Sequence, residues 1–232
     1  MRSLRPILPI LALVVSAAAA DTDPAIHARD QADIPALHQF IAQAQTDAKQ
    51  KNTADAYERV AQLNLWLCEA GHVNNDNKTV KQGAQDGIAA AEKAVALNPN
   101  SSEAHRLNGD LTGELIGVVF MGGMRHGKHA GDEFDKAIQL DPNNAEAYTG
   151  RAIGYFFTPS TFGGSKDKAV EYLQKALSIN PNLGRAHIWL AQVYQLEGKH
   201  EDAQREINEA LRIDPDRRFA KDGAAKLAQN AK

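Results

Sequence analysis

Two histidines and two methionines that lie close together in the sequence form the clearest candidate for metal chemistry. His126 and His129 are three residues apart, so a helix would carry both imidazoles on one face, and Met121 and Met124 lie just upstream. Imidazole and thioether groups suit soft metal ions. The alternative, which the sequence favours, is that these residues end a long helix and line an inserted segment.

The residue patterns of common catalytic sites are not found in the sequence. It contains no nucleophile–base set, no glycine-rich phosphate loop and no His-Glu-x-x-His motif. We therefore expect a protein that binds a partner, not an enzyme, and we expect no cofactor.

Four segments of similar pattern each end in Asn-Pro or Asp-Pro, at Pro99, Pro142, Pro181 and Pro215. Pro181 and Pro215 are 34 residues apart, which equals the period of about 34 residues known for one class of helical repeat. The two upstream intervals are longer, by five and nine residues. Because a proline disfavours the helical conformation in the residue before it, each pair should stop a helix.

Large and small apolar residues alternate within each unit at helical spacing. In the last unit Ala191 lies between Leu190 and Tyr194, and Ala203 and Ala210 fall on one face of the next helix. Small residues allow two antiparallel helices to approach closely. Over residues 54–215 the chain resembles the tetratricopeptide repeat family. The resemblance implies an all-α, helix-hairpin solenoid, for which we expect about ten helices in five hairpins.

The pattern predicts that each repeat unit is a pair of helices and that two units carry an insertion after their first helix. The predicted ranges are a signal peptide at 1–20, a flexible leader at 21–31, degenerate helical repeats at 32–100, repeats at 101–215 with insertions at 119–128 and 158–165, and a polar C-terminal capping helix at 216–232. A polar final helix is expected because a solenoid must cover its last apolar face.

The insertions suggest a narrower resemblance. Gly127-Lys128, the segment from Phe134 to Pro142 and the loop Phe162-Gly163-Gly164 resemble the helical-repeat group that contains the T component of TRAP transporters and the regulator-of-microtubule-dynamics proteins. This resemblance implies a compact all-α bundle that binds a partner protein.

The first helix of each unit normally lines the concave surface of such a stack. The residues predicted to face this surface and bind a partner are Arg106, Asp110, Glu146, Thr149, Ile153, Arg185, Ile188 and Gln192. We expect their polar groups to be exposed and to contribute little to folding. The insertions are the alternative binding elements. Recognition of a chaperone-type C-terminus is disfavoured, because Asp110 would repel a terminal carboxylate.

The N-terminus has the features of a secretory signal peptide. Arg2 and Arg5 precede a short apolar run and then small residues up to Ala20, which predicts cleavage near Asp21 and a periplasmic or secreted protein. The alternative is an uncleaved anchor.

The net charge of −3 and the lack of a basic run disfavour nucleic-acid binding. No later segment is apolar enough to span a membrane.

Three functions remain open. The first is an interaction module of the bacterial cell envelope that binds a protein or peptide. The second is a transport accessory or small-molecule carrier, and the third is metal handling around His126 and His129. The oligomeric state is not predicted.

Overall fold

The computed structural model describes residues 23–230, so the predicted signal peptide lies outside the described residues. Every regular element within this range is helical, which confirms the all-α prediction. The helices are α1 (Pro24–Asp30), α2 (Ile34–Lys51), α3 (Ala54–Val73), α4 (Asn77–Leu97), α5 (Ser102–Val118), α6 (Gly122–Leu140), α7 (Ala145–Phe157), a 3-10 turn (Ser160–Phe162), α8 (Lys166–Ile179), α9 (Gly184–Leu196), α10 (His200–Ile213) and α11 (Arg218–Asn230).

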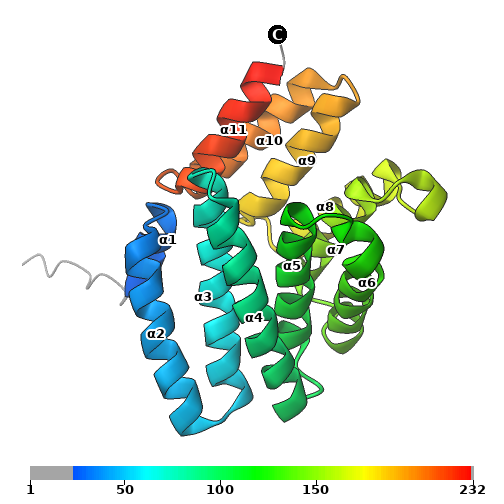
Figure 1. Cartoon of the computed structure of the whole chain (residues 1–232). Coiled ribbons are helices and arrows are strands. Elements are labelled where there is room, and N and C mark those ends of the chain that lie inside the picture. The colour runs from blue at the N-terminus through cyan, green and yellow to red at the C-terminus, as the bar shows by residue number, and fades with distance from the viewer. Residues whose placement is uncertain (1–22, 231–232) are drawn as a thin grey trace, which may run out of the picture.

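The helices form a stack of antiparallel hairpins (Figure 1). The principal pairs are α3 with α4, α5 with α6, α7 with α8, and α9 with α10, and α2 packs beside α3. The first helices of successive pairs also touch, because α3 contacts α5, α5 contacts α7, and α7 contacts α9. The predicted helix-hairpin solenoid is therefore confirmed.

The turns at Pro99, Pro142 and Pro181 share one hydrogen-bond pattern. In each turn the side chain of the Asn or Asp before the proline accepts a hydrogen bond from the backbone N–H two residues further on, at 2.9–3.2 Å. Such a side-chain bond mimics a backbone turn, which is why Asn and Asp are favoured there. The three units therefore reverse direction in the same way.

The N-terminal leader is not entirely flexible, and this part of the domain prediction is wrong. Residues 24–30 form α1. The residue that caps its N-terminus is Asp23, whose carboxylate accepts a hydrogen bond from the Ala25 N–H at 3.0 Å. Pro24 is tolerated because the first helical position needs no N–H. Ala25 and Ala28 are buried, so packing of their small side chains stabilises this short helix.

The two predicted insertions differ in structure. Residues 158–165 form a connection between α7 and α8, as expected. In contrast, most of 119–128 belongs to the first turns of α6, which begins at Gly122. A Cβ atom at Gly122 would lie 2.6 Å from the Ile116 carbonyl oxygen, so this glycine permits the close approach that lets α6 start early.

Two apolar cores are joined across α5, α6 and α7. The larger core extends from α1 to α5 around Leu37, Leu63 and Leu107, and the second extends from α7 to α11 in two adjoining clusters. Phe134 of α6 fills the junction. Its ring lies where a Cβ of Gly150 would be, at 2.2 Å, so the absence of a side chain at Gly150 lets α6 and α7 meet.

The final helix covers the last hairpin but also returns to the start of the chain. Ala220 and Ala224 are buried, and α11 contacts α3 as well as α9 and α10. Figure 1 shows α11 above α1 and α3. The predicted cap therefore also closes the stack, because its inner face packs on a helix about 150 residues earlier in the sequence.

Replacing Ala203 with Leu should overpack the last hairpin. Ala203 is 1% exposed and clusters with Ala191, Ile207 and Ala224, so a larger side chain should lower the free energy of unfolding by about 1–3 kcal/mol. Urea denaturation checks this. The matched control is Ala225→Leu at an exposed position of α11. Equal free energies of unfolding for Ala203→Leu and Ala225→Leu would contradict the tight packing of Ala203 in the last hairpin.

Candidate partner-binding pocket at the centre of the stack

A polar pocket of about 250 Å³ lies where the first helices of the units converge. Its lining comes from α1, α3, α5, α7, α9 and the residue before α11. The lining residues are Arg29, Gln62, Leu65, Trp66, Glu69, Glu103, Arg106, Glu146, Arg185 and Arg217. A larger and more open hollow of about 450 Å³ lies between α2 and α3. It contains none of the predicted binding residues, so the central pocket is the better candidate.

Asp110 is the centre of an ion-pair network beneath this pocket. Its side chain is only 1% exposed and lies between two guanidinium groups, with Arg106 Nη1 donating at 2.6 Å and Arg185 Nη2 at 2.7 Å. Arg106 also donates to Glu103 at 2.5 and 2.8 Å. Arg185 reaches Glu146 at 3.3 Å. Three helices, α5, α7 and α9, are thereby connected through charged side chains.

The carboxylates keep both arginines fully charged in spite of their burial. Burial alone lowers the pKa of Arg106, but the carboxylates of Glu103 and Asp110 outweigh that effect and hold its pKa above the ordinary value. Asp110 and Glu146 have the same effect on the pKa of Arg185. Charge-assisted hydrogen bonds of this kind are among the strongest in proteins.

A second ion pair closes the pocket from the other side. Arg217 Nη2 donates to both carboxylate oxygens of Glu69, at 2.7 and 2.8 Å. Because Glu69 belongs to α3 and Arg217 precedes α11, this contact joins the two ends of the stack. Arg217 Nε is buried and has no acceptor among the described residues.

The prediction that the concave residues are exposed is wrong. None of the eight is exposed: Arg106, Asp110, Thr149 and Ile188 are buried, and Glu146, Ile153, Arg185 and Gln192 are partly buried. The reason is that the first helices α3, α5, α7 and α9 pack against one another in turn and that α11 packs on both α3 and α9. Their role in partner binding stays a prediction.

Only some of the predicted residues come together. Arg106, Glu146 and Arg185 line the pocket, and Asp110 lies beneath them. Thr149 donates instead to the Ala145 carbonyl within its own helix, at 3.0 Å, and Ile188 packs near Gly223 of α11. Ile153 and Gln192 do not line the pocket.

Sequence reasoning missed the contribution of α3. Gln62, Trp66 and Glu69 are spaced four and three residues apart, so one face of α3 carries a polar strip around an indole. The guanidinium groups of Arg29 and Arg59 lie 5.3 and 5.2 Å from the Trp66 ring. This spacing is the signal for the polar strip in the sequence, although Leu65 and Leu67 lie on either side of Trp66.

His105 and His187 are buried, as packing residues would be, and they share one further arrangement. Each lies six residues after a repeat proline. In both, Nε2 is 3.1 Å from that proline's carbonyl oxygen, and Nδ1 contacts a glutamate of the next helix, at 2.6 Å for Glu133 and 2.5 Å for Glu206. A protonated His187 imidazole donates both of its bonds. Burial lowers the pKa of His187, but these two bonds outweigh burial and raise it above 6.5.

Of the residues named for metal handling, Met124, His126 and His129 lie in the first turns of α6. His129 is exposed, and its Nδ1 is 3.8 Å from Glu133. Within residues 23–230, no group of three or more His, Cys, Asp or Glu side chains is placed to hold a metal ion.

Comparison with known families identifies the repeat. Residues 164–227 match the family model described as tetratricopeptide repeat. Residues 164–227 therefore carry tetratricopeptide repeat sequence. Two solved structures support the fold. One is a thermophilic tetratricopeptide repeat protein of Thermus thermophilus, with a TM-score of 0.54 and 17% identity, covering 86% of this chain and 99% of that one.

The second is the HusA haemophore from Porphyromonas gingivalis, with a TM-score of 0.54 and 17% identity, covering 75% of this chain and 95% of that one.

Among curated proteins, the chain is 31% identical to the DnaJ homolog subfamily C member 7 homolog of Schizosaccharomyces pombe, over 77% of this chain and 43% of that protein. The chain spans less than half the length of the curated relatives it matches.

Arg106→Leu should strongly destabilise the tetratricopeptide stack. The change leaves the buried Asp110 carboxylate with one cation instead of two, and breaking such a buried pair costs about 3–5 kcal/mol. Urea denaturation measures the effect. The control Arg212→Leu removes an exposed arginine that pairs with Glu209 and should change the free energy of unfolding by less than about 1 kcal/mol. Similar values for both would contradict the burial of the network.

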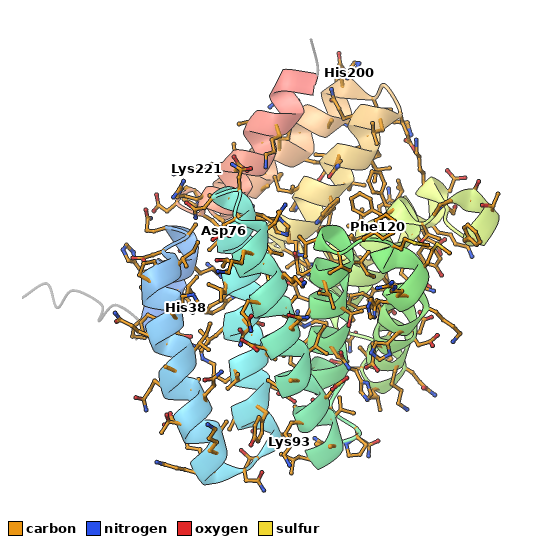
Figure 2. All side chains as sticks on the ribbon, in the orientation of Figure 1. His38, Asp76, Lys93, Phe120, His200 and Lys221 are labelled. Carbon is orange, nitrogen blue, oxygen red and sulfur yellow. The ribbon has the colours of Figure 1, made fainter. Side chains whose placement is uncertain are left out.

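The stability of the stack should fall as the pH rises through the titration of His187. Because the folded pKa is raised above 6.5, the contribution is complete below about pH 6.5 and is lost as the pH passes the folded value. His187→Gln should therefore flatten the pH dependence of the free energy of unfolding. The control His38→Gln changes an exposed histidine of α2 (Figure 2). If the free energy of unfolding of His187→Gln depends on pH as it does in the wild type, the titration of His187 is not the cause of the pH dependence.

Proposed function

We propose that this chain is a non-enzymatic interaction module of the bacterial cell envelope, which binds a protein partner at the central pocket. The tetratricopeptide fold is a scaffold suited to protein interaction. The observation that carries the proposal is the convergence of arginines and carboxylates from six segments around one pocket. Such a lining costs stability unless it is paired, and it offers hydrogen bonds in both directions to a bound peptide.

The rim of the pocket indicates the chemistry of the partner. Glu103 and Glu146 are its most accessible carboxylates, with side chains 46% and 37% exposed. They can accept hydrogen bonds from a basic side chain or from peptide N–H groups. Trp66 offers an aromatic surface. The partner that fits best is a peptide segment with a basic residue.

The size of the pocket favours a peptide contact over a small-molecule carrier. Sites that enclose drug-sized ligands are typically about 300–1,000 Å³ and mostly apolar. The central pocket is about 250 Å³ and is lined largely by charged groups. A transport accessory that grips a partner subunit remains compatible with the proposal, since it too would bind protein.

The envelope location rests on the N-terminal sequence. The pattern of Arg2, Arg5, an apolar run and small residues to Ala20 is typical of export signals. Among the helices that the structure describes, none has the length and apolar character needed to cross a bilayer. We propose that the mature chain begins near Asp21 and is periplasmic or secreted.

A photo-crosslinker at position 146 should capture the partner. We expect benzophenylalanine in place of Glu146, at the pocket rim, to form crosslinks in living cells to a peptide segment that mass spectrometry identifies. The matched control is the same residue in place of Glu171, which is exposed on α8 outside the pocket. Crosslinks to the same segment from both positions, or from position 171 alone, would place binding elsewhere.

Mass analysis of the mature protein should show an N-terminus within a few residues of Asp21. Osmotic shock of the native host should release the protein with the periplasmic fraction. An intact Met1 in the mature pool would contradict the proposed export.

A further inference from the structure

Exposed large apolar side chains are concentrated at one edge of the hairpin stack. Apart from Leu97, all such side chains among the described residues lie at or beside the turns that follow first helices. They are Phe120 (84% exposed), Met121 (45%), Met124 (79%), Phe157 (63%), Phe162 (79%) and Leu196 (59%). The proline turns at the other edge carry Asn and Asp instead. Single exposed apolar residues are ordinary, but a group at one edge marks an interaction site.

The repeat geometry places the two richest turns at the same end of the stack. The first helices α5 and α7 are in contact, and both run from a proline turn to this edge. Figure 1 shows the α5–α6 and α7–α8 connections on one side of the molecule, and Figure 2 shows Phe120 at this edge, with Lys93 near the opposite end. We call residues 119–128 and 157–168 the tip edge.

The backbone of the tip edge is held in conformations that present these side chains outward. Met121 has a φ of 57° although it is not glycine, a conformation that costs energy in most residues. Gly163 has a φ of 90° and turns the chain after Phe162. Phe157 is anchored, because its ring packs edge-on against Trp189 at 5.5 Å.

The charge of the tip edge is opposite to that of the whole chain. The chain carries a net charge of −3, but the tip edge contains Arg125, Lys128, Lys166 and Lys168 against one acidic residue, Asp167. Arg125, Lys128, Lys166 and Lys168 are all exposed. Neither Arg125 nor Lys166 forms an ion pair with another residue that the structure describes.

We propose that the tip edge docks on the surface of an anionic lipid bilayer. Phe120, Met124 and Phe162 would enter the boundary between headgroups and acyl chains, where aromatic side chains are favoured. Arg125 and Lys166 would pair with lipid phosphates, whereas Lys128 already pairs with Asp132 at 2.5 Å. The charge decides against a second copy of the chain as the occupant, since two basic tip edges would repel each other.

Vesicle flotation of the purified mature chain tests the proposal. We expect the protein to float with vesicles of phosphatidylcholine containing phosphatidylglycerol, and to bind pure phosphatidylcholine at least about tenfold more weakly. Replacing Phe120, Met124 and Phe162 together with Ser should reduce binding by at least about tenfold. Arg125→Gln with Lys166→Gln should reduce it about tenfold or more, since each basic residue contributes about fivefold.

The matched controls lie on the remainder of the stack. Leu97→Ser, and Lys93→Gln with Lys175→Gln, remove one exposed apolar residue and two exposed basic residues away from the tip edge. They should leave flotation unchanged, and circular dichroism should show all variants folded. No flotation of the wild type, or equal losses in tip and control variants, would overturn the proposal. A concentration-dependent dimer that the Ser variant abolishes, without lipid binding, would assign the edge to self-association instead.

Discussion

The buried carboxylate of Asp110, held between the guanidinium groups of Arg106 and Arg185, is the contact on which the shape of the stack depends. It lies beside Phe134, the apolar side chain at the junction of the two cores, and adds charged contacts to that packing. Removing these charges from water is costly, and the cost is offset only when every partner is present in good geometry. The network therefore requires α5, α7 and α9 to adopt one relative arrangement, and the Glu69–Arg217 pair extends that requirement to α3 and α11.

The sequence was sufficient for the local structure because its signals are local. Helix stops at Asn-Pro and Asp-Pro pairs, small residues at close contacts such as Gly109, and the period of 34 residues all act within one unit or its neighbour. The curvature of the stack is not local. Glu69 and Arg217 are 148 residues apart, and nothing in the register of one repeat shows that α11 returns to α3. Arg106 and Arg185 line the central pocket, but the expectation that they are exposed is wrong.

The two candidate surfaces differ in their physical character. The central pocket is polar, partly enclosed and lined by paired charges that limit its movement. The tip edge is apolar, basic and exposed, and much of it belongs to turns. Because the pocket lies on the inner face and the tip edge at the ends of the hairpins, both could be occupied together.

A double-mutant cycle between Asp110 and Arg185 tests the central claim most directly. Asp110→Leu, Arg185→Leu and the double variant are compared with the wild type by urea denaturation. If the ion pair is buried and connects α5 to α9, the two changes should be non-additive, with a coupling energy of about 1–3 kcal/mol. A coupling energy within about 0.3 kcal/mol of zero would show that the two residues act independently, and would contradict the account.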